Sequence, residues 1–243
     1  FVYDTTNSML YVNATADGSI TNSDYKISVN AATTAKDTIA DNDVTFTVTG
    51  TGYDDTIRGG EGIDSLTGGA GADDFLMYDT AYSNAAVVDV IEDFTIAQTD
   101  QVQFDISDIE SITAVIDLSN LNGTSISAGA LVTSGAATFS STYDLNAADG
   151  DEVLLISGDY ADAAAVQTGI RASLKGNGTV AAGDAILVAY DDGTDSTIAV
   201  VSSAAGVADN ELWDDAVVTD LVTVKGIADA TTIVSAHWMN IIA

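Results

Sequence analysis

Apolar and polar residues alternate in short runs along much of this chain, which is the pattern of half-buried β-strands. The alternation is clear at 1–13, 23–30 and 44–49, where polar residues separate the runs. Two apolar runs nearer the C-terminus, at 186–190 and 197–201, are joined by the sequence DDGTD, and its Asp-Gly pair favours the left-handed turn of a hairpin. The pattern therefore predicts a mainly β fold with antiparallel segments on both sides of its centre.

One segment has the periodicity of a helix instead of a strand. Residues 162–178, DAAAVQTGIRASLKGNG, place their apolar side chains on one face, and Gly176 is suited to end the helix. The apolar face consists of Ala163, Val166, Ile170 and Leu174. We expect this one short helix to cover a sheet in the C-terminal part of the chain.

Between the flanking strands the chain becomes rich in glycine and aspartate and acquires a period of nine residues. Residues 50–76 read GTGYDDTIR, GGEGIDSLT and GGAGADDFL, which places Asp55, Asp64 and Asp73 at the same position of each copy. A large apolar residue follows each aspartate at a constant interval: Ile57, Leu66 and Phe75. A repeat of the form GGxGxDxUx, where U is a large apolar residue, is typical of a short parallel β-roll.

The same repeats predict calcium loops, because glycine permits positive φ and lets backbone carbonyl oxygens turn towards an ion. The aspartate adds a carboxylate, and Ca²⁺ accepts about six to eight oxygen ligands in flexible geometry. Successive coils alternate sides, so loop 50–55 should share an ion with loop 68–73, although Thr51 and Tyr53 replace glycines in the first loop. We expect room for one or two ions. The predicted metal-ligating positions are Gly50, Gly52, Asp55, Gly59, Gly60, Gly62, Asp64, Gly68, Gly69, Gly71 and Asp73.

Composition favours a cation as ligand and excludes other classes. Lys and Arg number 6 against 37 Asp and Glu, and the net charge of −31 opposes compaction unless divalent cations relieve it. Nucleic acid is excluded as a partner, since phosphate binding needs basic side chains. Cysteine is absent, so a metal must be held by oxygen ligands. Hydrophobic residues make up 47% of the chain, too many for a disordered acidic tail.

Other acidic segments have simpler interpretations. Residues 13–24 carry polar residues at EF-hand spacing, but carboxylates are few and the flanks are strand-like, so we interpret the segment as a plain turn. Asp191, Asp192 and Asp195 lie in the DDGTD sequence, where turn chemistry explains them before metal binding does.

The sequence marks no catalytic site. The single histidine, His237, lies near the C-terminal end of the chain, and we expect a core or interface side chain beside Trp238. There is no HExxH motif, and Trp213 and Trp238 are expected to be core or interface anchors. We therefore predict that the chain is not an enzyme.

The nonapeptides resemble the RTX (repeats-in-toxin) repeats of proteins that Gram-negative bacteria export by type I secretion. Residues 75–107 are similar to the capping segment of RTX rolls, in which an Asp-x-Ile-x-Asp-Phe element precedes a final acidic strand. That element consists here of Asp89, Ile91, Asp93 and Phe94. The resemblance implies that Asp89 and Asp93 help to close the last calcium position, with Asp100 as a third candidate. The alternative is that these are solvated acidic residues at strand ends.

Residues 183–227 resemble the C-terminal regions of type I secreted proteins, including S-layer proteins, which carry an uncleaved export signal. The resemblance implies three parts: the end of a preceding β module at 1–48, the calcium-binding roll and its cap at 49–110, and a β-rich domain with the export signal at 111–243. Since no signal peptide or membrane-spanning segment is recognisable, we expect no membrane insertion. The sequence starts on a strand-like segment without Met, and we therefore expect the chain to be part of a longer protein.

The function that this resemblance implies is that of an extracellular, calcium-binding structural protein of the cell surface, such as an S-layer or filament subunit. Its partners would be further copies of itself, in a lattice or filament, and the type I secretion machinery during export. The alternative is the C-terminal export and calcium-folding domain of a secreted hydrolase, toxin or adhesin.

Overall fold

The computed structural model of the chain describes its core elements with gaps between them. The described residues are 2–4, 9–12, 25–29, 44–45, 47–59, 63–77, 88–104, 129–130, 138–139, 143–144, 153–175, 185–203, 205–208 and 211–240. Of the sequence predictions, those on 13–24, Gly60, Gly62 and Gly176 lie outside these residues.

The N-terminal residues form a small antiparallel sheet, as the alternating pattern predicts. Its strands, in spatial order, are β1 (Val2–Asp4), β2 (Met9–Val12), β3 (Tyr25–Val29) and β4 (Val44–Thr45). The run at 44–49, expected as one strand, is divided between two sheets, because its second half forms β5 (Thr47–Thr49) and pairs elsewhere.

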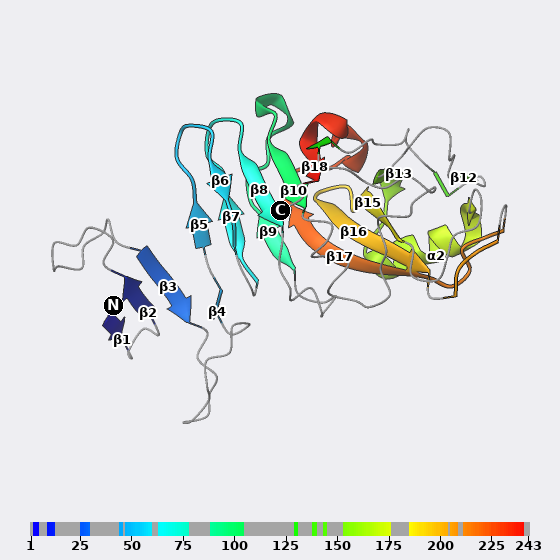
Figure 1. Cartoon of the computed structure of the whole chain (residues 1–243), viewed down its shortest axis with the longest axis horizontal. Helices are drawn as coiled ribbons and strands as arrows, with labels where there is room; N and C mark the ends of the chain where they lie inside the picture. Colours follow the sequence, from blue (N-terminus) through cyan, green and yellow to red (C-terminus); the bar gives the residue numbers. More distant parts are fainter. Residues whose placement is uncertain are drawn as a thin grey trace, which may run out of the picture.

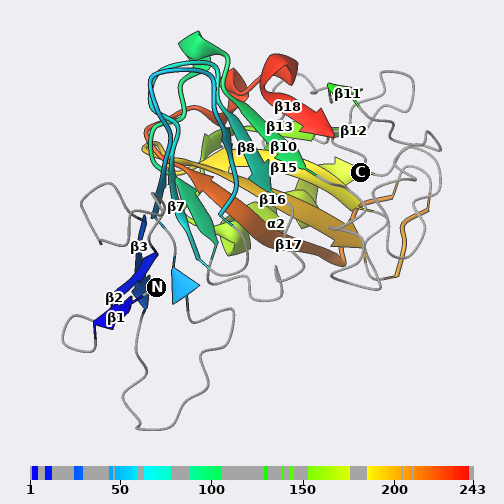
Figure 2. The same cartoon turned by 60° about the vertical axis from the view of Figure 1, so that its left-hand side comes forward.

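The nine-residue repeats form a parallel β-roll, so the predicted fold class is confirmed. Alternate strands join opposite sheets: β5, β7 and β9 pair in parallel in one sheet, and β6, β8 and β10 do so in the other. The further bounds are β6 (Thr56–Ile57), β7 (Ser65–Thr67), β8 (Asp74–Met77), β9 (Asp89–Ile91) and β10 (Gln101–Phe104). These strands stand side by side in Figure 1, and Figure 2 shows them again from a second direction.

Both sheets of the roll continue into the C-terminal part of the chain. Strand β17 (Ala216–Val224) adds in parallel to β9, and β18 (Trp238–Asn240) adds in parallel to β10. The larger sheet therefore has the order β13-β15-β16-β17-β9-β7-β5, and the smaller one β11-β18-β10-β8-β6. The three-part division at residues 48 and 110 stays a prediction. Strands on the two sides of residue 110 pair directly, β9 with β17 and β10 with β18.

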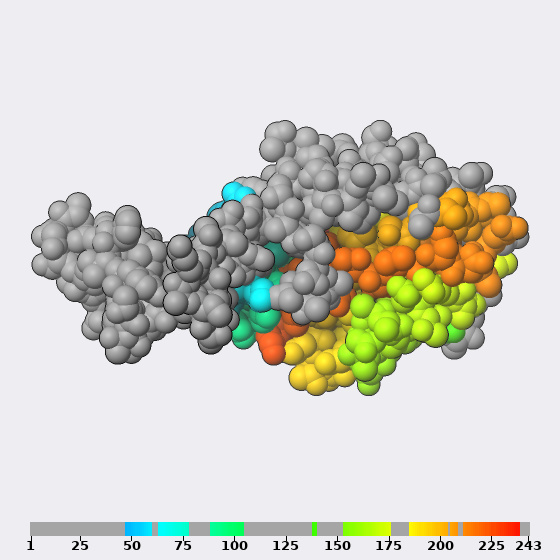
Figure 3. All heavy atoms as spheres, turned by 90° about the horizontal axis from the view of Figure 1, so that it is seen from below, coloured from blue at the N-terminus to red at the C-terminus, as the bar shows by residue number. Residues whose placement is uncertain are grey.

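The C-terminal sheet is built around the predicted hairpin, in which β15 (Ala185–Asp191) and β16 (Ser196–Ser203) are antiparallel. Helix α2 (Ala163–Ser173) packs on β17, where Arg171 Nε donates to the Ala216 carbonyl oxygen, and Figure 3 shows the two segments side by side, in lime and orange. The helix ends at Ser173, because the next residue, Leu174, already forms a strand. The remaining elements are β11 (Gly129–Ala130), β12 (Tyr143–Asp144), β13 (Val153–Asp159), β14 (Leu174–Lys175), and the short 3-10 turns η2 (Ile96–Gln98), η4 (Ala230–Thr232) and η5 (Ser235–His237).

One hydrophobic core runs from the roll into the C-terminal sheet. The repeat residues Ile57, Leu66 and Phe75 are buried, as the nine-residue pattern requires. Trp213 and Trp238 are fully buried, which confirms their interpretation as core anchors. Among the described helices, none is long and apolar enough to span a membrane.

Candidate calcium site

The repeat loops lie in two rows, one at each end of the roll strands. Loops 50–55, 68–73 and 92–100 follow β5, β7 and β9 and are stacked on one another. Backbone hydrogen bonds hold the stack together. The Asp74 amide donates to the Asp55 carbonyl oxygen at 2.8 Å, and the Gln101 amide donates to the Asp73 carbonyl oxygen at 2.8 Å. The predicted alternation of the coils is confirmed, since loop 50–55 lies beside loop 68–73. Their sharing of an ion stays a prediction.

The first row carries a ladder of aspartates. The Asp55 amide donates to Asp73 Oδ1 at 2.9 Å, and the Asp73 amide donates to Asp100 Oδ1 at 3.0 Å. The second oxygen of Asp100 accepts the Thr95 amide at 2.7 Å. Burial increases inwards, since Asp55 is partly exposed while Asp73 and Asp100 are buried. The structure therefore brings together two of the predicted ligands and the third candidate of the cap.

The second row repeats the arrangement on the other side of the roll. The Asp64 amide donates to Asp89 Oδ1 at 2.8 Å, and both side chains are buried. Asp89, which the cap resemblance implies as a ligand, thus accepts the amide of the preceding aspartate of its row, as Asp73 and Asp100 do in the first row. Solvated acidic residues at strand ends would be exposed, so this alternative does not describe Asp89.

Glycine is required in the loops because the aspartate carboxylates lie directly over the backbone. A Cβ atom built on Gly68 would stand 2.3 Å from Asp73 Oδ2, and one on Gly59 would stand 2.4 Å from Asp64 Oδ2. Gly69 and Gly71 have φ angles of 99° and 139°, in the region that L side chains avoid. The glycines of the repeat pattern therefore allow the aspartate carboxylates to lie close to the loop backbone, as a cation site lined by oxygen atoms needs.

Asp93 holds the third repeat loop from the cap. Its two carboxylate oxygens accept the amides of Gly68 at 2.7 Å and Gly69 at 2.9 Å. A carboxylate receiving two backbone amides is a strong anchor for a loop. Metal ligation by Asp93 stays a prediction, and the contact that the structure gives it is this clamp.

The donor set fits a hard cation. Asp73 is fully buried, and its Oδ2 accepts no hydrogen bond from the residues that the structure describes. Leaving a buried carboxylate oxygen without a partner is costly, and calcium is a partner that glycine-lined loops can accommodate. Within the described ranges no three His, Asp or Glu side chains converge on one point, so the loops' own carbonyl oxygens would supply the remaining ligands.

Burial also perturbs the pKa of Asp100, at the inner end of the first row. It raises the pKa of Asp100, and the charges of Asp73 and Asp93 add to the rise, while hydrogen bonds from the Asp73 and Thr95 amides oppose it. Burial likewise raises the pKa of the neighbouring Asp74. A bound divalent cation would favour the ionised carboxylates that crowding and burial disfavour.

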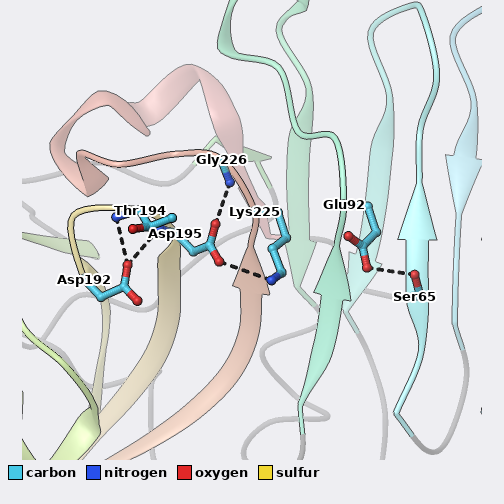
Figure 4. Close-up of polar contacts among 7 residues, drawn as sticks. All are labelled: Ser65, Glu92, Asp192, Thr194, Asp195, Lys225 and Gly226. Carbon is cyan, nitrogen blue, oxygen red and sulfur yellow. Dashed lines mark hydrogen bonds and ion pairs between the residues drawn. The ribbon is translucent and has the colours of Figure 1, made fainter.

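The acids of the C-terminal hairpin have the turn chemistry expected of them. Asp192 Oδ1 accepts the amides of Thr194 and Asp195, as Figure 4 shows. Asp195 accepts the Gly226 amide at 2.8 Å and pairs with Lys225 at 3.3 Å. Asp191 is buried and joins the turn to η4 by accepting the Ala230 amide at 2.9 Å.

Two residues of the site carry more weight than the sequence suggested. Asp100 is the innermost member of the first row. In the sequence, only its position after the Asp-x-Ile-x-Asp-Phe element of the cap marks it as a candidate ligand. Thr51 looked like a defect in the first repeat, but its amide and Oγ1 both donate to Asp55 Oδ2, at 2.5 and 2.8 Å.

Stacked glycine loops with aligned aspartates on a parallel roll define a calcium-binding β-roll. The family model described as RTX calcium-binding nonapeptide repeat (4 copies) matches residues 49–76, from the last residue of β5 into β8. No curated protein and no solved structure matches the chain. The chain thus contains RTX repeats, whose ion is Ca²⁺, and proteins with such repeats are typically secreted.

Proposed function

We propose that this chain is a secreted structural protein of the cell surface, an S-layer or extracellular filament subunit, in which calcium drives folding and assembly outside the cell. The observation that supports this most is the buried Asp73 carboxylate in a stacked repeat loop, because a bound cation would satisfy its unpartnered oxygen. The roll in turn supplies the strands on which β17 and β18 pair.

Calcium would act as the signal that the chain has left the cell. With a net charge of −31, the calcium-free chain resists compaction, which suits passage through a type I secretion channel. Extracellular calcium modules bind with dissociation constants of about 10⁻⁴ to 10⁻³ M, so their loops fill at the millimolar calcium found outside cells. Binding to the folded state alone then pulls the folding equilibrium forward.

Self-association is supported by the edges of the roll. Strands β5 and β6 are the outermost strands of their sheets, and each pairs on one side only among the described strands. Thr47 and Thr49 of β5 are exposed. An exposed edge presents backbone donors and acceptors that a strand of another copy can satisfy.

The proposal gives the chain no catalytic role. His237 is buried, and its Nδ1 lies 2.8 Å from the Asp100 carbonyl oxygen, so this nitrogen is already engaged in a structural contact. The ring also packs edge-on against Phe94.

Electron microscopy of the purified chain with millimolar calcium, and with a chelator in its place, tests the function. We expect ordered sheets or fibres with calcium and dispersed, poorly folded chains with chelator, with circular dichroism following folding in the same samples. Calcium-folded particles that remain monomeric at all concentrations would contradict the assembly role and favour an export and folding domain of a hydrolase, toxin or adhesin. Co-expression with a type I exporter, with and without residues 233–243, tests export separately.

A further inference from the structure

Loops 50–55 and 68–73 are the same part of the first and third repeats, and in each loop the aspartate Oδ2 lies close to the first glycine. In each loop the aspartate Oδ2 lies over the first glycine, since a Cβ on Gly50 would be 2.9 Å from Asp55 Oδ2 and one on Gly68 would be 2.3 Å from Asp73 Oδ2. The two oxygens are therefore directly comparable.

Their hydrogen bonding differs. Asp55 Oδ2 accepts two bonds from Thr51, one from the amide at 2.5 Å and one from Oγ1 at 2.8 Å. Asp73 Oδ2 has no hydrogen-bond partner among the described residues and is fully buried. The second position of the third repeat is Gly69, which has no hydroxyl to offer.

The orientation of the Thr51 hydroxyl is set by its neighbour. The Tyr53 amide lies 3.3 Å from Thr51 Oγ1 and donates to it, which leaves the hydroxyl hydrogen for Asp55. The resulting ring of bonds closes loop 50–55 on itself.

The backbone of the first loop also lacks the conformation of a calcium loop. Gly69 and Gly71 have positive φ, whereas the corresponding Thr51 and Tyr53 do not, because Thr99 is the only non-glycine residue with positive φ in the described part of the chain. The carbonyl groups of loop 50–55 consequently follow a different course from those of loop 68–73.

The inner end of the row is satisfied by the protein as well. Asp100 receives the Asp73 amide on one oxygen and the Thr95 amide on the other. Protein donors therefore occupy Oδ2 of Asp55 and both oxygens of Asp100. Within this row, Asp73 is the acid whose Oδ2 is buried and accepts no hydrogen bond from the described residues.

We propose that Thr51 terminates the first calcium row: its amide and hydroxyl take the place of an ion at Asp55, so the row holds a single ion, at Asp73. The inference rests on calcium binding by the repeats and adds a stop residue that sets how many ions they take. The repeat pattern predicts Asp55 as a calcium ligand, whereas here its carboxylate accepts hydrogen bonds from Thr51. A Thr in the second position would mark where an ion row ends.

Native mass spectrometry of the full chain at saturating calcium counts the ions directly. We expect Asp55→Asn to leave the count unchanged and Asp73→Asn to lower it by one. The double variant Thr51→Gly with Tyr53→Gly, which restores both glycines of the repeat, should raise the count by one. Tyr53→Gly alone and Thr51→Ser keep the hydroxyl and should match the parent chain, and circular dichroism confirms that each variant is folded.

The outcomes separate the inference from the calcium role itself. If Asp55→Asn loses an ion as Asp73→Asn does, or if the double variant gains none, Thr51 is not a terminator and calcium binding stands. If Asp73→Asn leaves the count unchanged, both the terminator and the ion at this row are wrong.

Discussion

The ring of His237 lies with its Nδ1 2.8 Å from the backbone carbonyl oxygen of Asp100, so the C-terminal segment contacts the residue that ends the first aspartate row. A carbonyl oxygen only accepts, which means that Nδ1 carries the proton. Beside this contact, Gln101 Nε2 donates to the Ala236 carbonyl oxygen at 3.2 Å. Residues 236–237 are thereby held against the cap of the roll.

Replacing His237 by Phe keeps an aromatic ring in the core and removes this hydrogen bond. We expect a loss of about 1–3 kcal/mol in the free energy of unfolding, because the substitution leaves a buried carbonyl without its donor. Denaturant unfolding in saturating calcium measures it. Val234→Ala, an exposed position just before η5, is the matched control and should change stability little. Equal stability of both variants would show that the contact to Asp100 contributes nothing.

Two glycines of the first row should respond in opposite ways to alanine. In Gly68→Ala the new Cβ would stand 2.3 Å from Asp73 Oδ2, so we expect the buried carboxylate to be displaced and calcium affinity to fall at least about tenfold, which corresponds to about 1.4 kcal/mol. In Gly52→Ala the Cβ meets nothing within 4 Å, and restricting the unfolded chain should stabilise the fold by about 0.4–1 kcal/mol.

Calorimetric calcium titration and thermal unfolding of the two variants test this contrast. A weakened affinity in Gly52→Ala would assign that glycine a direct part in ion binding, as the repeat pattern alone predicts. An unchanged affinity in Gly68→Ala would mean that the Asp73 carboxylate does not ligate the ion.

The repeat period accounts for what the sequence could predict. A nine-residue spacing fixes which side chain enters the roll, so the burial of Leu66 and Phe75 and the alignment of Asp55 with Asp73 follow from it. The Asp-Gly turn predicted the β15–β16 hairpin for an equally local reason, since Gly193 has a φ of 84° there.

The features that escaped prediction depend on contacts between distant segments. Nothing local to Trp238 indicates that it adds a strand to β10, and nothing near 222–224 indicates pairing with β9. The helix ended early for a similar reason: Leu174 enters β14 and pairs with Tyr143, a tertiary contact that overrides its helical propensity. By the repeat pattern Thr51 is a poor match, and only its contact with Asp55 shows what it does.

Stability should depend on pH through Asp220, which accepts the Tyr190 hydroxyl at 2.9 Å. Burial raises the pKa of Asp220, while that hydrogen bond lowers it. Burial also raises the pKa of Tyr190, so the phenol stays protonated at neutral pH. A carboxyl whose pKa is higher in the folded state favours folding when protonated. Its contribution is fully present below the unfolded value of 3.8 and is lost as pH rises through the folded value.

We therefore expect Asp220→Asn to stabilise the fold at pH 7 and to lose that advantage as the pH falls below about 4. Asp214→Asn removes the same charge from an exposed site and is the control. Denaturant unfolding of the two variants and the parent chain from pH 3 to 8 gives the comparison. An advantage of Asp220→Asn that is equal to that of Asp214→Asn at every pH would exclude a specific cost of burying Asp220.

Calcium removal should unfold the chain in a defined order, because the roll strands depend on the ion directly and the C-terminal sheets depend on the roll. At free calcium of 100 times the dissociation constant, one bound ion stabilises the folded state by about 2.7 kcal/mol, and this is lost in chelator. We expect amide hydrogen exchange in chelator to rise first in strands β5 to β10, then at 222–224 and in β18, which lose β9 and β10 as partners. The central hairpin of β15 and β16 should stay protected longest, since its pairing lies within the C-terminal sheet.

Magnesium at equal concentration is the control and should not restore protection, because its strict octahedral geometry suits these loops poorly. Exchange that rises uniformly across all strands would show instead that the roll and the C-terminal sheet unfold as one unit.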